Sequence, residues 1–394
     1  MTNVEHVSAL DLLTGDAQVF REKIWASRVH LHQVDPATLV GKLSLDDVDH
    51  LLTSTAMRTP AMRMAKDGQV LPESRYTRGA TLAGRPLTGL VDARKVFAEL
   101  DDGASVVLQG LHRYWPPLRD LVAQLELELG HPCQANAYLT PPHSQGFAVH
   151  SDSHDVIVFQ TAGRKVWEVH EAPDGDPDGP REAREVVLEP GVAMYLPTGT
   201  PHAARAQDEL SLHVTIGINQ LTWNGLVRRS VAPLLDAIDD GHLPAGFADD
   251  PALLREGLAL RLELLADQLR GLDPATVAEA EASRVLTSRV PHLRGGLTDR
   301  LGAPIEDDTV LVRRTGRPCV LRDNPDADDR VDLLLGDRVV TLPSWLRPAL
   351  EAIRGAQRLR PADLGELDPP LDPQSRVVLC RRLVREGLLT RAGA

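Results

Sequence analysis

The chain has 394 residues and a net charge of −13, and 42% of its residues are hydrophobic and 25% charged. This length exceeds what one ordinary core can organise, so two or three domains are expected. The acidic balance argues against broad contact with nucleic acid, whose phosphates attract Lys and Arg, and direct nucleic-acid binding is therefore not expected. The negative charge would attract a basic partner, although a role in solubility alone explains the charge equally well.

The three cysteines, Cys133, Cys319 and Cys380, are far apart and odd in number. This pattern excludes a disulfide framework or a Cys-type zinc motif and predicts reduced thiols. The N-terminal segment MTNVEHVSALDLLTGD lacks a basic region followed by an apolar run, so no signal peptide is expected. No apolar stretch approaches the ~20 residues of a membrane span. We therefore expect a soluble protein of the cytoplasm without a membrane partner.

Helical patterns dominate from Val7 to about Leu129. The segment SLDDVDHLLTST begins with a Ser cap, and PPLRDLVAQLELELG ends at Gly130, a residue type that terminates helices. Between them SVVLQGLH has the composition of a strand. This part of the chain is therefore expected to consist mainly of short helices.

Short β-runs separated by turns follow from Gln134 to Gln220. Strands of this length and spacing predict a sandwich or barrel. The runs are QANAYLT, GFAVHSD, DVIVFQT, KVWEVHE, REVVLEP, VAMYLPT and SLHVTIGI. The insert EAPDGDPDGPREA is rich in Pro, Gly and Asp, and we expect it to form a loop on the rim of this β-domain.

From Leu226 to about Val290 the pattern is helical again. The segment PALLREGLALRLELLADQLRGL repeats Leu at intervals of three and four residues, which gives an amphipathic face. A leucine-rich helix of this kind must cover the β-domain, another helix or a second subunit. The breadth and length of the apolar stripe favour the second subunit and predict a homodimer.

The tail from about Gly295 begins with the strand-like runs TVLVRRT, PCVLRD, RVDLLLG and RVVTLP. Three helical segments follow, SWLRPALEAIRG, PADLGEL and DPQSRVVLCRRLVREG, and the chain then ends with LLTRAGA. Three helices before a short β-extension suggest a winged-helix-like module.

Two histidines and two carboxylates interrupt the apolar pattern in GFAVHSDSHDVIVFQ. In a strand, residues i and i+2 point to the same face, so His150 and Asp152 should project together. The turn PTGTPHAA places His202 ahead of a later strand. Two His and one carboxylate on one side of a metal form the facial triad of non-haem iron(II) sites, which leaves positions open for oxygen and a co-substrate. The alternative for His150 and Asp152 is a hydrogen-bonded pair in the core.

The other histidines of the β-domain, His154, His170 and His213, are expected to be structural or to support the ligands. His213 is also a candidate for the pocket wall, because Ser211, His213 and Thr215 share one face of a strand.

Lys165 opens the run KVWEVHE, shortly after Gly163. From the start of a strand its ammonium could reach the mouth of the barrel and bind a carboxylate as a point charge. The alternative is a solvated lysine in a turn beside Arg164.

The segments NAYLTPPHSQGFAVHSDSHDVIVFQTAGRKVWEVH and LEPGVAMYLPTGTPHAA together resemble the JmjC-type cupin oxygenases, in particular their ribosomal oxygenase branch. The match is dense across residues 136–219, and the rest of the layout is similar with less sequence specificity. The resemblance implies an α+β fold built on a double-stranded β-helix, the cupin or JmjC jelly roll. It also implies iron(II) held by His150, Asp152 and His202, with 2-oxoglutarate and O2 as co-substrates.

The resemblance further implies that Lys165, fifteen residues after the first ligand as in that family, holds the distal carboxylate of 2-oxoglutarate. Asn136 and Tyr138 occupy positions at which the family has pocket residues, and Thr215 is taken as a further co-substrate contact. The leucine-rich helices would be a dimerisation segment. Members of the family hydroxylate arginine or histidine side chains of ribosomal proteins, so a basic ribosomal protein is the implied substrate and partner.

The expected organisation has three parts, namely a JmjC/cupin catalytic domain with N-terminal helices (1–225), a helical dimerisation segment (226–294) and a winged-helix-like domain (295–394). Three alternatives stay open. The first is a hydroxylase of a peptide natural product or small molecule, and the second is a metal cupin that does not use 2-oxoglutarate. The third is a metabolite-sensing regulator whose tail binds DNA. Its candidate contacts are Arg376, Arg381, Arg382 and Arg385, for which a solvated charged face is the simpler explanation.

Overall fold

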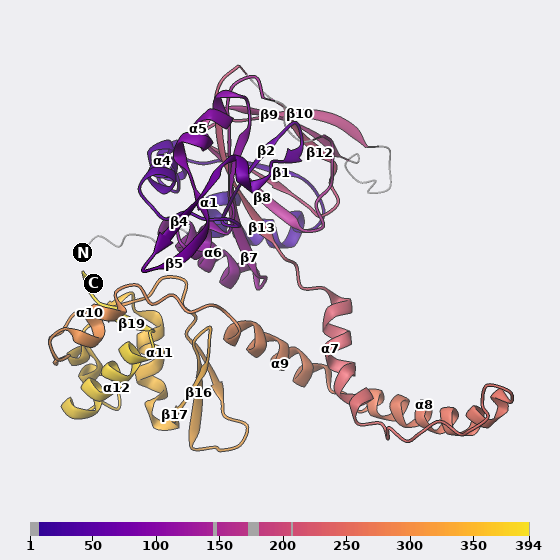
Figure 1. The fold of residues 1–394 in the computed structure, drawn as a ribbon. Helices are drawn as coiled ribbons and strands as arrows, with labels where there is room; N and C mark the ends of the chain where they lie inside the picture. Colours follow the sequence, from indigo (N-terminus) through magenta and orange to yellow (C-terminus); the bar gives the residue numbers. More distant parts are fainter. Residues whose placement is uncertain (1–7, 145–147, 172–180, 206–207, 394) are drawn as a thin grey trace. The chain divides into compact units, whose positions relative to one another are not determined.

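The structure, a computed structural model, describes residues 8–144, 148–171, 181–205 and 208–393. The chain divides into two compact units, Met1–Gln220 and Leu221–Ala394 (Figure 1). The division into three parts stays a prediction, because the second unit contains both the helical segment and the tail. Most of the predicted acidic loop, residues 172–180, lies outside the described residues.

Two antiparallel sheets form the body of the first unit. The larger sheet has eight strands, in the spatial order β1 (His30–Gln33), β11 (Val192–Leu196), β8 (Asp155–Gly163), β13 (Ser211–Ile218), β7 (Cys133–Thr140), β6 (Ser105–Leu108), β2 (Met62–Lys66) and β3 (Gln69–Val70). The smaller sheet has three, in the order β10 (Glu182–Leu188), β9 (Lys165–Glu171) and β12 (His202–Arg205). Six of the seven predicted β-runs are strands of these two sheets.

The seventh run, GFAVHSD, is not a regular strand in its described part. Strand β8 begins only at Asp155, and before it His150 alone pairs with a neighbouring strand. The His150 N–H donates to the carbonyl of His202 at 3.0 Å, and the His202 N–H donates back at 2.8 Å. This segment passes from the edge of the smaller sheet into β8 of the larger sheet, so it cannot continue the ladder of either one. The expectation that His150 and Asp152 lie within a strand is therefore wrong.

Alternating side chains give the larger sheet two different faces. On β8, Ile157 and Phe159 belong to the main hydrophobic core, whereas Val156 and Val158 belong to a second cluster together with Trp167 of β9. Strands β7 and β13 alternate in the same way, and their apolar residues face the main core. The residues that they contribute to this core are Cys133, Ala135, Ala137, Leu139, Leu212, Val214, Ile216 and Ile218. Their opposite side is mostly polar, and this is where a cavity lies between the sheets.

Helices of the first unit pack against the outer face of the larger sheet, and the main hydrophobic core lies between them. They are α1 (Ala9–Thr14), α2 (Ala17–Val19), a π-helix (Phe20–Ile24), α3 (Pro36–Val40), α4 (Leu45–Thr53), α5 (Ala93–Asp101) and α6 (Pro116–Leu129). Both helices predicted from terminal signals are confirmed. Ser44 caps α4 in a capping box with Asp47, and Gly130 ends α6 in a left-handed conformation.

The N-terminal part contains more strands than its sequence pattern indicates. Strand β2, with the sequence MRMAK, consists of good helix formers, but its pairing with β6 overrides that preference. Strands β4 (Thr77–Leu82) and β5 (Arg85–Val91) form a separate hairpin. Ala83 and Gly84 connect them with φ values of 46° and 75°, the left-handed conformation that two-residue hairpin turns require.

The second unit begins with three helices that carry no buried residue, α7 (Trp223–Asp236), α8 (Arg255–Arg270) and α9 (Pro274–Thr287). They confirm the helical pattern of this segment. Many of their apolar side chains are exposed in the single chain and the others are half-buried, and Leu258 and Leu262 of α8 are each 55% exposed. No helix in the described part of the chain is long and apolar enough to cross a membrane.

The tail has a hydrophobic core of its own. Its elements are α10 (Gly296–Leu301), the sheet β18–β14–β19 (Arg358–Leu359, Leu311–Arg313, Leu389–Arg391), the meander β15–β16–β17 (Val320–Asp323, Arg330–Leu334, Val339–Pro343), α11 (Arg347–Gly355) and α12 (Pro373–Arg385). The predicted middle helix is a 3₁₀-helix, Pro361–Glu366. Pro369 and Pro370 follow it closely and leave no room for regular α-helical turns.

Candidate metal centre and co-substrate pocket

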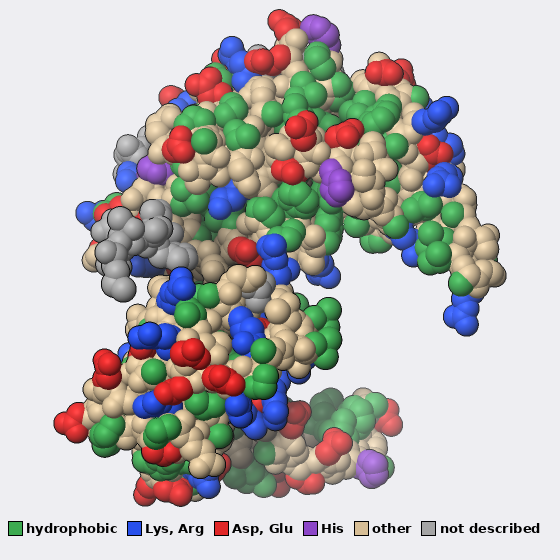
Figure 2. All heavy atoms as spheres, turned by 90° about the vertical axis from the view of Figure 1, so that its left-hand side faces the viewer, with side chains coloured by type: hydrophobic (Ala, Val, Ile, Leu, Met, Phe, Trp, Pro, Cys, Tyr) green, Lys and Arg blue, Asp and Glu red, His purple; other side chains and the backbone are tan. Residues whose placement is uncertain are grey.

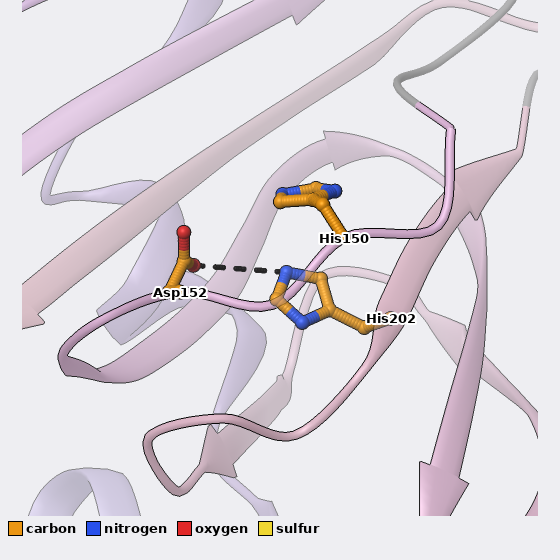
Figure 3. A group of neighbouring side chains, drawn as sticks. All are labelled: His150, Asp152 and His202. Atoms are coloured by element: carbon orange, nitrogen blue, oxygen red, sulfur yellow. Dashed lines mark ion pairs between the residues drawn. The ribbon is translucent and has the colours of Figure 1, made fainter.

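Three side chains converge where the loop before β8 meets the start of β12. His150 and Asp152 come from the loop, and His202 is the first residue of β12 (Figure 3). One ligand atom of each lies within 4.8 Å of those of the other two, and Nε2 of His202 is 3.7 Å from Oδ2 of Asp152. The paired backbones of His150 and His202 hold the two imidazoles beside each other, with ring centroids 4.5 Å apart.

Hydrogen bonds fix which nitrogen of each imidazole faces the centre. Nδ1 of His150 lies 2.9 Å from the carbonyl of Ala148, and Nδ1 of His202 lies 2.9 Å from the carbonyl of Thr200. A carbonyl only accepts, so each Nδ1 carries the proton and each Nε2 presents its lone pair to the centre. Burial of His202 lowers the pKa of its imidazole and favours the neutral form. Two neutral imidazoles and one carboxylate fit a divalent iron ion and leave coordination positions for exchangeable ligands.

Asp155 connects the two segments that carry the ligands. Its buried carboxylate accepts from the Tyr195 hydroxyl at 2.6 Å, from the Thr198 N–H at 2.8 Å and from the Thr198 hydroxyl at 2.6 Å. Thr198 opens the turn that leads into His202, and Asp155 follows Asp152 by three residues. The carboxylate therefore sets the distance between the loop and the turn, although it is no ligand itself. The sequence pattern assigned it no role.

Replacing Asp155 by Ala is expected to weaken iron(II) binding about 10- to 100-fold, the usual cost of losing a group that orients metal ligands. Titration of the apo-protein with iron(II) under anaerobic conditions measures this. Asp155→Asn is the matched control, because its amide oxygen can still accept from Thr198 while its NH₂ faces the oxygen of Tyr195. Wild-type iron affinity in a folded Asp155→Ala protein would show that the two segments hold their positions without this carboxylate.

A cavity of about 310 Å³ opens beside the three side chains, which is within the usual range for a small-molecule site. Apolar residues from β8 and β12 and polar residues from β7, β9 and β13 line it. The residues that matter here are His150, Asp152, His202, Lys165, Tyr138, Thr140, Thr215, His213, Ser105, Trp167, Val156, Val158 and Ala204. The ligand set and the cavity therefore form one site.

Lys165 lies inside this cavity and not in a solvated turn. The residue is 5% exposed, and its Nζ donates to Oγ1 of Thr140 at 3.1 Å. Among the described residues no carboxylate forms an ion pair with it, and burial lowers the pKa of its ammonium to about 8. Arg164, by contrast, points outward toward Glu209. A buried ammonium with two spare donors and no anionic partner fits a ligand that brings its own carboxylate.

The structure places the other predicted contacts on the same side of the larger sheet. Tyr138 and Thr215 line the cavity. Asn136 pairs with Thr215 across β7 and β13, and its amide oxygen accepts from the Gly110 N–H at 2.9 Å. The contacts that these three residues make with a co-substrate stay predictions.

The position of His213 supports its candidacy for the pocket wall. It stacks on Tyr138 with ring centroids 4.9 Å apart and lines the cavity, and its buried Nδ1 has no hydrogen-bond partner among the described residues. Nε1 of Trp167, also in the lining, is unpaired too. His170 instead bonds Glu168 at 2.9 Å, and it is not among the lining residues.

Thr140 and Ser105 are pocket residues that the sequence analysis missed. Oγ1 of Thr140 accepts from Lys165 and, at 3.2 Å, from the Ser105 hydroxyl, so the Thr140 proton stays available to a ligand. Thr140 follows Tyr138 by two residues, and period-2 alternation could have identified it. Ser105 lies on β6, and its place in the site depends on sheet order.

Comparisons with known proteins agree with this geometry. Residues 117–226 match the family model described as the JmjC domain. The chain is 28% identical over 295 residues to ribosomal oxygenase 1 of Rattus norvegicus, which covers 69% of this chain and 46% of that protein. It is 33% identical over 157 residues to the bifunctional lysine-specific demethylase and histidyl-hydroxylase NO66 of Drosophila grimshawi, which covers 36% of this chain and 21% of that protein.

Among solved structures, the Escherichia coli ribosomal oxygenase YcfD has the same fold, with a TM-score of 0.52 at 19% identity over 96% of this chain and 99% of that one. The chain spans less than half the length of the curated relatives it matches. Residues 117–226 are therefore a JmjC domain, and the chain is homologous to the ribosomal oxygenases.

Proposed function

We propose that the protein is an iron(II)- and 2-oxoglutarate-dependent oxygenase that hydroxylates a side chain of another protein. One observation carries the proposal, namely that the triad His150, Asp152 and His202 shares a cavity with Lys165, a buried cation without an anionic partner among the described residues. A second structure of YcfD, with a TM-score of 0.51 at 20% identity, holds cobalt and 2-oxoglutarate. This supports the same pair of ligands here.

In this mechanism His150, Asp152 and His202 would hold the iron, and three protein ligands would leave coordination positions for the co-substrates. Lys165 and the hydroxyl of Thr140 donate to the distal carboxylate of 2-oxoglutarate, which orients the co-substrate along the cavity. Val156, Val158 and Ala204 exclude water from the space between. The bound metal and its co-substrates supply the oxidation, in which 2-oxoglutarate and O2 give succinate, carbon dioxide and one hydroxyl oxygen inserted into a substrate C–H bond.

The test is an anaerobic titration of the apo-protein with iron(II) and then 2-oxoglutarate, followed by the visible charge-transfer absorption of the iron chelate. Absorption that needs both components supports the oxygenase. Tight metal binding without such absorption would favour the alternative of a metal cupin that does not use 2-oxoglutarate.

The pH dependence of 2-oxoglutarate binding tests the role of Lys165 separately. The pKa of about 8 means that the ammonium loses its proton as the pH rises through 8, so affinity should be full below that pH and fall above it. Between pH 7 and pH 9 the Kd is expected to rise about tenfold in protein loaded with manganese(II), a redox-stable substitute for iron. Calorimetry measures the change. In Lys165→Ala this pH dependence should be absent, and its persistence there would assign it to another group.

We propose a ribosomal protein as the substrate, with arginine or histidine as the modified residue. The curated relatives are named ribosomal oxygenases and a histidyl-hydroxylase, and the net charge of −13 suits a basic partner. Such a substrate also favours action in the cytoplasm. Mass spectrometry of ribosomal proteins incubated with the enzyme tests this, with an added oxygen atom as the expected result. Turnover only with a small molecule or a short peptide would support the alternative substrate class.

We further propose that the second unit mediates dimerisation through α7–α9 and that residues 295–394 are a winged-helix-like domain. Helices α7–α9 have no buried residue within the single chain, although they are partly apolar. Trp223 of α7 is 82% exposed, and α8 carries a row of leucines. Exposed apolar surface of this extent is typical of an interface.

Three of the four tail arginines considered for DNA binding make contacts within the second unit instead. Arg376 pairs with Asp307, Arg381 bonds the Ile305 carbonyl and Arg382 pairs with Glu386.

Sedimentation analysis is expected to find a dimer for the full chain. Substituting Leu258 and Leu262 of α8 by Arg should yield a monomer, because two charges on an apolar interface oppose its burial. Leu243→Arg is the control, since Leu243 is 62% exposed and lies outside these helices. A dimer that survives the double substitution would rule out the α8 face as the interface.

A further inference from the structure

A second hollow, of about 390 Å³, lies within the second unit. Residues of α10, α12 and β19 line it, together with Arg314, which directly follows β14, and parts of the connecting segments. Five arginines contribute to its lining, which are Arg300, Arg314, Arg381, Arg385 and Arg391. The lining includes one acidic residue, Asp299. We call this hollow the arginine pocket.

Asp299 compensates little of this positive charge. Its side chain is 2% exposed, and it accepts from Arg314 at 2.5 Å, from the Thr390 hydroxyl at 2.8 Å and from the Arg391 N–H at 3.0 Å. One carboxylate balances one guanidinium, so the remaining lining retains an excess of positive charge. The carboxylate also fixes the positions of β14 and β19 relative to α10.

Arg314 is buried with part of its donor set unpaired. Its side chain is 8% exposed, and its Nη groups bond Asp299 and the carbonyl of Arg294, but its Nε has no hydrogen-bond partner in the part of the chain that the structure describes. Nε of Arg391 is also buried and unpaired, while its Nη2 bonds the carbonyl of Ala303. A buried donor without an acceptor is unfavourable, so the fold leaves both guanidinium groups incompletely satisfied, and both residues line the pocket.

The other arginines surround the same space. Arg381 donates from Nε and Nη2 to the Ile305 carbonyl at 3.1 and 2.7 Å, which holds its guanidinium in place. Arg300 and Arg385 are exposed, and no ion pair joins either of them to another described residue. On the face drawn in Figure 2, acidic and basic side chains are interspersed over the surface. The arginine pocket differs because its charges are nearly all of one sign.

We propose that the arginine pocket binds a small phosphate-bearing ligand. The planar fork of guanidinium matches two phosphate oxygens at once, and a phosphate group carries more charge than a single carboxylate. The excess of arginines over acids suits such a multiply charged anion. The volume of the pocket falls in the usual range for small-molecule sites, larger than one free phosphate requires. This site is independent of the metal centre, which lies in the first unit.

Calorimetry of the full-length protein with inorganic phosphate, pyrophosphate and ADP at low ionic strength tests the proposal. Binding of at least one of them is expected, weakened by added salt. ADP or pyrophosphate that binds more tightly than phosphate assigns the site to a phosphorylated metabolite, whereas equal affinity assigns it to the free anion. No binding of any of the three, or binding of an RNA oligonucleotide alone, overturns the proposal.

Variants locate the binding. Arg385→Gln and Arg300→Gln are each expected to raise the Kd about tenfold, since each removes an exposed charge that no described residue pairs with. Arg314→Lys should act similarly, because it keeps a charge but loses the planar fork of a guanidinium that lines the pocket. Arg382→Gln is the matched control on the same helix, since Arg382 pairs with Glu386 at 2.8 Å and does not line the pocket. An equal loss in Arg382→Gln would overturn the assignment, and a thermal scan confirms that each variant is folded.

Discussion

Replacing Asp152 by Ala is expected to abolish 2-oxoglutarate turnover and to weaken iron(II) binding by more than about 100-fold. Loss of a group that only orients a ligand costs up to about that factor, and Asp152 is the sole carboxylate of the proposed triad. Its removal leaves two imidazoles, which is too few to retain iron. The anaerobic iron titration and a succinate assay measure the two effects.

His154→Ala is the matched control for this prediction. His154 lies two residues after Asp152 in the same loop. Its ring lies beside Gly217, and it is not among the residues that line the cavity. Iron affinity and turnover should stay within about twofold of wild type, a smaller change than the loss of one ordinary hydrogen bond produces. An Asp152→Ala protein with wild-type activity would falsify the triad assignment.

Replacing Lys165 by Ala is expected to raise the Kd for 2-oxoglutarate roughly 10- to 150-fold. This corresponds to the loss of about 1.5–3 kcal/mol for a hydrogen bond to a charged group. The affinity for iron(II) alone should not change, because Lys165 is no ligand of the metal. Titration of the iron-loaded protein with 2-oxoglutarate separates the two quantities.

Arg164→Ala is the control next to it in sequence. Arg164 is exposed and lies 3.8 Å from Glu209, so its removal should leave the Kd for 2-oxoglutarate within about twofold. If Lys165→Ala also bound 2-oxoglutarate with wild-type affinity, another donor would hold the distal carboxylate, and Thr140 and His213 are the next candidates in the lining.

The strongest sequence signals were local ones. Ser44 and Gly130 mark helix ends through the chemistry of single residues, and the alternation in β7, β8 and β13 follows from a period of two. The spacing of His150, Asp152 and His202 likewise depends on short motifs, and the structure brings the three together. The same reasoning erred where it extended the β-run through His150, because the segment leaves one sheet for another.

Two features of the site needed the folded chain. In the sequence nothing distinguishes Asp155 from other acidic residues. Its role follows only from its hydrogen bonds with Thr198 and Tyr195, some 40 residues away. Ser105 enters the pocket because β6 lies next to β7 in the sheet. Neither position carries a local signal, since hydrogen-bond partners distant in sequence leave no periodic pattern.

The sequence by itself determined the β-domain, the residues able to bind a metal and the lysine able to bind a carboxylate, because residue chemistry and strand periodicity are properties of short segments. The tertiary structure decided that these groups share one cavity, that β2 is a strand despite its helix-forming residues, and that five arginines from separate elements line one pocket in the second unit. Such outcomes depend on which segments pair and on what they bury, and these are energies of the whole fold.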